Sequence, residues 1–180
     1  MFTNNYYRCI ASALTNKNNP SYTALDGSTQ LLSYPTHGLK FGGDSYGEAS
    51  MSKVSTNINS SNSVGAVFGD GNTPPTAEDY KLSGNYITSG FDYTAALSYN
   101  FTDADASITA TYTITNTSEA PISIKEVGLI AALNQISTAN NIKNNALIDR
   151  TVLDTPVTIP AGGVGQVVYT ITLTYPTATT

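Results

Sequence analysis

The sequence predicts an all-β protein, an antiparallel β-sandwich for which a jelly-roll strand order is one option. Three observations predict it. Thr, Ser and Asn supply most of the polar character, because only 12% of the 180 residues are charged. Tyr occurs 12 times and, together with Thr, Val and Ile, fits the pleated and half-buried surface of a strand. The 14 Gly and 8 Pro give frequent turn signals between short alternating segments, which is typical of all-β domains.

The first 63 residues have the weakest pattern. Residues 6–14 fit either a strand or a short helix, and Ser and Asn dominate residues 52–63. We therefore expect residues 1–63 to form an arm, or extra strands, packed on the core or on a neighbouring molecule. Residues 64–180 are expected to form the β-sandwich domain itself.

The middle of the chain alternates strands with a long loop. Val64–Phe68 is a short apolar strand, and the sequence GDGNTPPTAEDYKLSG that follows, residues 69–84, has the Gly-Asp and Pro-Pro steps of a loop. Strands are predicted within that loop at residues 80–82 and after it at residues 93–101. From Ser107 to Ile114, apolar residues alternate strictly with Ser and Thr, which predicts a strand with one buried face.

The last third contains the remaining strands. Residues 116–121 form a turn, and apolar positions resume at Ile122 and Ile124. They then change parity, which predicts a β-bulge at Lys125-Glu126. The Asn-rich residues 131–145 predict a long exposed loop. Three further strands are predicted, with a turn at residues 160–163 before the last of them: residues 152–153, 157–159 and 167–175.

Composition excludes several classes of function. The net charge is −5 and the pI about 4.5, so the basic footprint of a nucleic-acid-binding protein is missing. There is no polybasic run of the kind that anchors proteins to membranes, and no apolar run approaches the roughly 20 residues that span a bilayer. The N-terminal residues MFTNNYYRCIASAL lack the features of a signal peptide, so we expect synthesis in the cytoplasm without export.

Catalytic groups are sparse. A nucleophilic triad would have to use His37, the one histidine, with Ser33, Ser45 or Cys9 as the attacking group. His37 lies in the turn-like sequence Pro-Thr-His-Gly, and the interpretation as a surface turn residue is favoured. Cys9, the one cysteine, is most simply a small buried apolar residue. One His and one Cys do not make a zinc site, and no cofactor is expected. An enzyme is the least favoured class.

Carboxylates offer a calcium site as an alternative to turn chemistry. Asp70, Glu78 and Asp79 lie in one loop, and Asp103 and Asp105 are two residues apart. Calcium takes six to eight oxygen ligands, and the chain has no D-x-D-x-D-G loop. Turn formation and capping are therefore favoured. A carboxylate pair for glycoside hydrolysis is less favoured still, because Trp is absent.

Tyrosines are more numerous than one small core requires. Tyr combines a large rigid ring with a polar tip, and is enriched at interfaces. Ordinary packing in the sheets and contact with neighbouring subunits or with carbohydrate are both open. The interface candidates are Tyr6, Tyr7, Tyr46, Tyr86 and Tyr93, and Tyr80 belongs to the same group.

Three segments together resemble a known class of protein. They are VGAVFGDGNTPPTAEDYKLSG, YTITNTSEAPISIKEVGLIAAL and ALIDRTVLDTPVTIPAGGVGQVVYTITLTYP, which lie in this order between residues 64 and 176. This order is similar to that of small β-rich structural proteins in the particles of tailed bacteriophages. The resemblance carries no catalytic residue.

The resemblance implies a non-enzymatic virion protein that acts in many copies. Capsid decoration, or another auxiliary role in the assembly of the head, neck or tail, is the expected function. The implied partners are other copies of the chain and the major capsid, neck or tail proteins, with neither nucleic acid nor membrane among them. The alternative is a receptor- or glycan-binding module of a head or tail fibre. A glycan platform would then be built from the loops that carry tyrosines.

Specific contacts are expected for the 69–84 loop. Glu126 lies among apolar strand residues, where a carboxylate is costly unless it is paired. Arg150 is its natural partner, so we predict a Glu126–Arg150 salt bridge between neighbouring strands. Asp79 is expected to cap backbone N–H groups, and Tyr80 to close the end of the sandwich. The loop would then be a structural latch.

Overall fold

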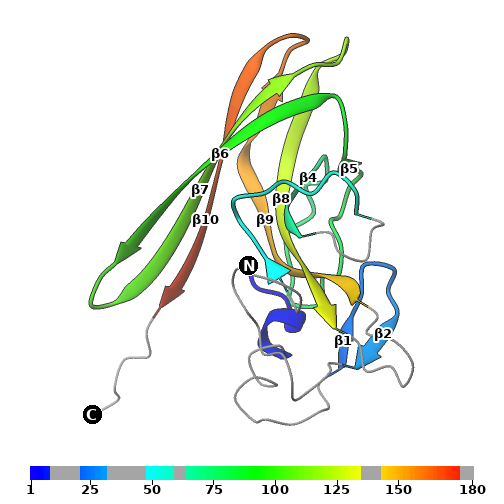
Figure 1. Cartoon of the computed structure of the whole chain (residues 1–180), viewed down its shortest axis with the longest axis vertical. Helices are drawn as coiled ribbons and strands as arrows, with labels where there is room; N and C mark the ends of the chain where they lie inside the picture. The colour runs from blue at the N-terminus through cyan, green and yellow to red at the C-terminus, as the bar shows by residue number, and fades with distance from the viewer. Residues whose placement is uncertain (9–20, 32–47, 59–63, 135–142, 175–180) are drawn as a thin grey trace. The chain divides into compact units, whose positions relative to one another are not determined.

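The structure is a computed structural model that describes residues 1–8, 21–31, 48–58, 64–134 and 143–174, and these are mostly antiparallel strands (Figure 1). The predicted fold class, all-β and sandwich-like, is confirmed. Residues 4–8 are helical. The strands are β1 (Ser21–Thr23), β2 (Thr29–Leu31), β3 (Glu48–Ala49), β4 (Gly65–Gly69), β5 (Tyr86–Ile87), β6 (Phe91–Phe101), β7 (Asp105–Asn116), β8 (Ile122–Asn134), β9 (Lys143–Ile159) and β10 (Val164–Thr174).

The chain divides into two compact units. One contains Met1–Ser89 and Ile124–Pro156, and the other contains Gly90–Ser123 and Val157–Thr180. The boundary predicted at residue 63 does not coincide with this division, and the first residues of the expected arm pair with β9. Phe2 forms an antiparallel bridge with Asp149, and the Thr3 N–H donates to the Ile148 carbonyl at 3.1 Å. In the described residues, the start of the chain is thus packed on its own core.

β8 is the central strand of the first unit. The sheet order is β3-β8-β4-β5, and β9 also pairs with β8. The ladder between β4 and β8 is regular, from Gly69 opposite Glu126 to Gly65 opposite Ile130. This ladder has no inserted residue between Glu126 and Ile130, and it does not reach Lys125, so the bulge at Lys125-Glu126 stays a prediction. Residues 126–133 are all buried, which means that both faces of β8 are covered and both parities are apolar.

The predicted long exposed loop at residues 131–145 is wrong at both of its ends. β8 continues to Asn134 and β9 begins at Lys143, and residues 131–133 and Asn145 are buried, whereas residues 135–142 lie outside the described residues. Asn145 was expected to be exposed because Asn favours loops, but its side chain is buried and donates to the Ile58 carbonyl at 3.0 Å. Residues 152–153 and 157–159 belong to one strand, β9. Residues 80–82 are not a strand, and the chain pairs again at β5.

The core of the first unit forms around a small cluster. Four fully buried residues contact one another, and Leu25, Ile58 and Tyr86 pack against them: Val67, Leu82, Ile130 and Leu147. These residues come from β4, the 69–84 loop, β8 and β9. The loop therefore contributes a side chain to the core and is part of the folded unit.

Gly128 is a point at which this core has no spare volume. A β carbon at position 128 would lie 2.7 Å from Leu147 Cδ1 and 2.9 Å from Leu82 Cδ2. We expect Gly128→Ala to lower the free energy of unfolding by about 1–3 kcal/mol, measured by urea denaturation with circular dichroism. In the Leu147→Val background the same change should cost less, because a shorter side chain leaves room. Strictly additive effects would contradict this explanation.

The second unit contains the clearest alternation, and its strands are confirmed. The sheet order is β10-β7-β6, and both ladders run antiparallel over the full length of the strands. The predicted turns also form. Gly162 has φ +68°, the Gly163 N–H donates to the Pro160 carbonyl at 2.9 Å, and the buried Asn116 amide donates to the Ile159 carbonyl at 3.0 Å. Tyr175 lies outside the described residues.

Candidate functional site

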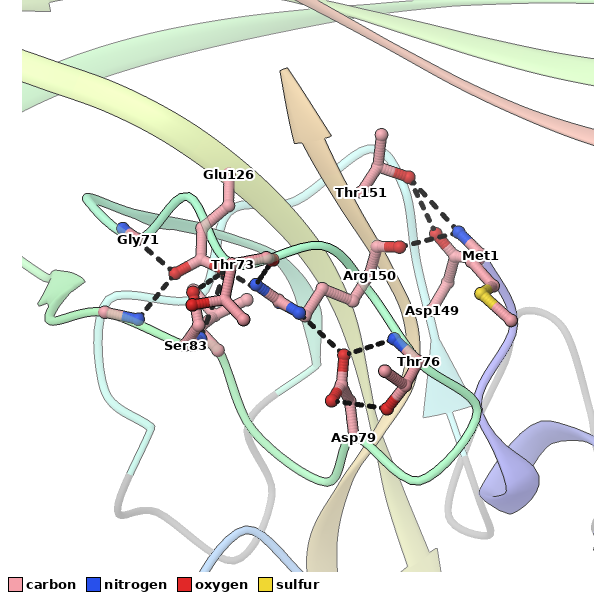
Figure 2. A network of polar contacts seen from close by, with 12 residues as sticks. Met1, Gly71, Thr73, Thr76, Asp79, Ser83, Glu126, Asp149, Arg150 and Thr151 are labelled. Atoms are coloured by element: carbon pink, nitrogen blue, oxygen red, sulfur yellow. Dashed lines mark hydrogen bonds and ion pairs between the residues drawn. The ribbon is translucent and has the colours of Figure 1, made fainter. Parts of the chain in front are cut away.

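The 69–84 loop is held by a buried ion pair between two strands. Arg150 Nε on β9 lies 2.7 Å from Glu126 Oε2 on β8, which confirms the predicted salt bridge (Figure 2). Both side chains are almost completely buried. A buried ion pair persists only when its remaining polar atoms are also satisfied. The 69–84 loop provides most of those partners.

The Glu126 carboxylate joins the two ends of the loop. Its Oε1 accepts hydrogen bonds from the Gly71 N–H at 3.1 Å and from the Gly84 N–H at 2.8 Å. Its Oε2 accepts from the Ser83 N–H at 3.1 Å and from the Ser83 hydroxyl at 3.2 Å. One carboxylate therefore closes a loop of sixteen residues. Glycine is required at both ends, since a β carbon at Gly71 or Gly84 would collide with atoms at the other end of the loop.

Arg150 holds the middle of the loop. Its Nη1 donates to Asp79 Oδ2 at 2.6 Å and its Nη2 to the Thr73 carbonyl at 2.7 Å. Asp79 in turn accepts from the Thr76 N–H and from the Thr76 hydroxyl, both at 2.9 Å, so the predicted cap is confirmed. The planar guanidinium suits this role because it presents several donors in fixed directions. We call Glu126, Arg150, Asp79 and the groups bound to them the Glu126 network.

The network keeps its members charged. Burial acts to raise the pKa of Glu126, but hydrogen bonds from the Gly84 N–H, Arg150 and the Ser83 N–H outweigh it, so this pKa lies below its ordinary value. The pKa of Asp79 is also lowered, because the bonds from Thr76 and Arg150 outweigh burial. The two carboxylates raise the pKa of Arg150 against the effect of burial.

The sequence points to the wrong apolar anchor for the loop. Tyr80 was expected to close the sandwich, but its ring is only partly buried and lies 3.5 Å from the position of a β carbon on Gly27. Lys81 Nζ lies 5.6 Å from the centre of the same ring. The buried anchor is Leu82, whose N–H also donates to the Tyr86 hydroxyl at 3.1 Å. The Ser-Gly step after Leu82, which mirrors the Gly-Asp-Gly at the start, is the sequence signal that marks both loop ends.

The N-terminal residues hold the loop from its outer side. The Asn4 N–H donates to the Ala77 carbonyl at 2.7 Å, and the Asn4 side chain donates to Glu78 Oε1 at 2.8 Å. The Met1 amino group lies 3.1 Å from Oδ1 of Asp149, the residue that precedes Arg150 in the sequence (Figure 2). These contacts are not visible in any motif, because they join segments more than seventy residues apart.

The three calcium candidates bind different partners. Asp70 accepts from the Asn85 N–H at 2.7 Å and from its side chain at 3.2 Å, which lowers the pKa of Asp70. Glu78 binds Asn4, and Asp79 belongs to the Glu126 network. Elsewhere, Asp105 accepts from the Thr102 hydroxyl at 3.2 Å. Among the described residues, no group of three or more His, Cys, Asp and Glu side chains is placed to hold a metal ion.

Calcium is therefore expected to leave the stability unchanged. The oxygens of Asp70 and Asp79 already accept protein hydrogen bonds, so a cation would have to displace them. We expect the melting temperature in about 5 mM CaCl₂, which is above the dissociation constants of weak extracellular calcium sites, to stay within about 1 °C of that in EDTA, because a ligand stabilises only when it binds the folded state. MgCl₂ at equal ionic strength is the control. A calcium-specific rise that is lost in Asp70→Asn would contradict this prediction.

The tyrosine candidates have separate environments. Tyr6 stacks on Phe2 with ring centres 3.8 Å apart, and Tyr86 packs against the core cluster. Tyr7 is exposed, and Tyr93 is partly buried on β6. The remaining candidates from the sequence lie outside the described residues: Cys9, Ser33, His37, Ser45 and Tyr46.

Comparisons with known proteins add no relative. The sequence matches no protein-family model and no curated protein, and the structure matches no solved structure. Within the described residues, no helix has the length and apolar character needed to cross a membrane.

Proposed function

We propose that the chain is a non-enzymatic structural protein of a tailed-bacteriophage particle, which acts in many copies as a capsid decoration or other auxiliary assembly protein. Its partners would be other copies of the chain and the major capsid, neck or tail protein. The chain would be made in the host cytoplasm and incorporated into the virion. The resemblance of residues 64–176 supports this proposal, and the Glu126 network is the observation that carries it.

The network supports the proposal because it fixes an exposed loop. A free loop of this length would have to be ordered when a neighbour binds, and that ordering weakens binding. In this chain, Glu126 joins Gly71 to Gly84, and Arg150 joins Thr73 to Asp79, before any partner arrives. The charged groups are directed inward, to the loop, and the outer surface keeps its preformed shape. Repeated contacts between subunits, each burying on the order of 1,200 Å² or more, use such surfaces.

Particle composition tests the proposal. A tagged copy of the chain is expressed in cells that produce phage particles from a genome carrying its gene, and the particles are purified on a density gradient. We expect the chain to sediment with the major capsid protein in a fixed ratio and to appear as regular density by electron microscopy. Complete particles that lack the chain would contradict the proposal. Micromolar binding to one glycan on an array would favour the adhesin instead.

A further inference from the structure

One face of the β10-β7-β6 sheet is apolar along its length. The ladders align the strands so that each β7 residue on this face lies between one residue of β6 and one of β10. Four successive rows, in the order β6, β7, β10, are Ala95-Tyr112-Val167, Leu97-Ala110-Tyr169, Tyr99-Ile108-Ile171 and Phe101-Ala106-Leu173. Charged residues are absent from all four rows.

This face is covered at one end and open at the other. Tyr112, Val167 and Tyr169 are fully buried. In the same region the Ile159 side chain packs against Gly165, so that a β carbon at position 165 would lie 2.7 Å from Ile159 Cγ1. Toward the β6–β7 turn the exposed fractions rise to 37% for Leu97, 60% for Tyr99, 72% for Phe101 and 41% for Leu173. These four residues, with the partly buried Ile108 and Ile171, form what we call the apolar end.

The opposite face of the same strands is suited to water. Three successive rows, in the order β6, β7, β10, are Thr94-Thr113-Gln166, Ala96-Thr111-Val168 and Ser98-Thr109-Thr170, so polar residues predominate and Val168 is the large apolar exception. The Thr109 and Thr170 hydroxyls bond to each other at 2.8 Å. Since both faces come from the same alternating strands, the open apolar end is a property of one face and not of the whole sheet.

We propose that the apolar end packs face to face against the apolar end of a second copy of this chain. This inference names one partner of the proposed function, and it rests on that function because copies of the chain must meet in the particle. The four most exposed side chains offer about 400 Å² per copy, because a residue of this size has roughly 200 Å² of surface. Two copies then bury about 800 Å² through these side chains, and about 100 Å² more per copy from the surrounding residues reaches about 1,000 Å², the lower limit for a specific interface.

A two-fold arrangement fits the chemistry of this surface. An isologous interface requires a patch that is complementary to itself, and an uncharged apolar strip packs well against its own copy. Asp103 lies in the turn next to the apolar end, and Asp105 is the first residue of β7. Strands that run in opposite directions in the two copies place these carboxylates at opposite ends of the interface, whereas parallel strands would bring four of them together. We therefore expect the antiparallel arrangement. Because each copy carries a net charge of −5, we also expect tighter association at high salt.

Sedimentation equilibrium of the full chain tests the inference. We expect a reversible dimer with a dissociation constant in the micromolar range, on the scale of an interface of this size. Tyr99→Thr/Phe101→Thr should weaken the dimer about 30-fold or more, because buried aromatic residues dominate such interfaces. Val168→Thr is the matched control, since Val168 is exposed on the opposite face of the same sheet and should leave the dimer unchanged. Circular dichroism verifies that each variant is folded.

Photo-crosslinking gives a second readout that does not depend on loss of binding. A photoreactive phenylalanine at position 101 should give a covalent dimer, and the same group at position 168 should not. A wild-type chain that stays monomeric at several hundred micromolar, or equal dissociation by the control variant, overturns the inference. A monomer that associates only after residues 175–180 are removed also overturns it, and identifies the chain's own C-terminal segment as the cover.

The two proposals can fail separately. If the chain is present in particles but its self-association is unchanged by the Tyr99 and Phe101 substitutions, the inference is wrong and the proposed function stands. If the chain is absent from particles but still dimerises through the apolar end, the proposed function is wrong and the interface stands.

Discussion

Arg150→Met is expected to lower the free energy of unfolding by about 3–5 kcal/mol, the cost of leaving a buried charge without its partner. Methionine fills a similar volume but donates no hydrogen bond. Glu126 would lose the donor at 2.7 Å, while Asp79 and the Thr73 carbonyl would lose theirs at 2.6 Å and 2.7 Å. Denaturation in guanidinium chloride, followed by circular dichroism, measures the change.

Two arginine variants are the controls for this result. Arg150→Lys keeps the positive charge but cannot reach three acceptors in fixed directions, so its cost should be intermediate. Arg8→Met removes an arginine of the same unit whose Nη1 donates to the Ser21 carbonyl at 2.9 Å, its one hydrogen bond to a described residue. We expect about 1 kcal/mol for that change. An Arg150→Met chain as stable as the Arg8→Met chain would show that the Glu126 network does not stabilise the fold.

The ion pair was predictable because Glu126 is a charged residue among apolar strand residues. A carboxylate within an apolar strand requires a cation, and Arg150, which directly precedes the predicted strand at residues 152–153, is its natural partner. The bonds from Arg150 to Asp79 and Thr73 were not predictable, since no periodicity relates residues that are more than seventy positions apart. The same holds for Gly71 and Gly84. Their role depends on where the Glu126 side chain ends, and only the folded structure fixes that point.

The two units differ in how clearly their sequences specify strands. In the second unit each strand has one apolar and one polar face, so alternation predicts β6, β7 and β10. In the first unit β8 is buried on both faces, and the Asn-rich residues at the end of its apolar run resemble a loop. Leu82 was missed for a related reason, since one apolar residue in a loop has no period. Alternation also marks the apolar end as buried, although Phe101 is open in the structure.

Glu126→Gln is expected to lower the stability by about 2–4 kcal/mol at pH 7, because an amide loses the charge to which Arg150, three backbone N–H groups and one hydroxyl donate. The loss should shrink in acid. The folded-state pKa of Glu126 is lowered, so its contribution is fully present above the ordinary Glu pKa of 4.5 and is lost as the pH falls through the folded value. Wild type should therefore lose stability below that pH more steeply than Glu126→Gln.

Denaturation curves from pH 7 to about pH 2.5, the range that spans ordinary and lowered carboxyl pKa values, measure this convergence. A residual slope is expected in Glu126→Gln, because the lowered pKa of Asp79 acts in the same direction. Glu119→Gln, in the exposed turn between β7 and β8, is the matched control and should follow the wild-type curve. Parallel curves for wild type and Glu126→Gln over the whole range would mean that Glu126 acts through its shape and hydrogen bonds alone. In that case the charge that Arg150 carries would be held by Asp79, and the loop would depend on the second ion pair more than on the first.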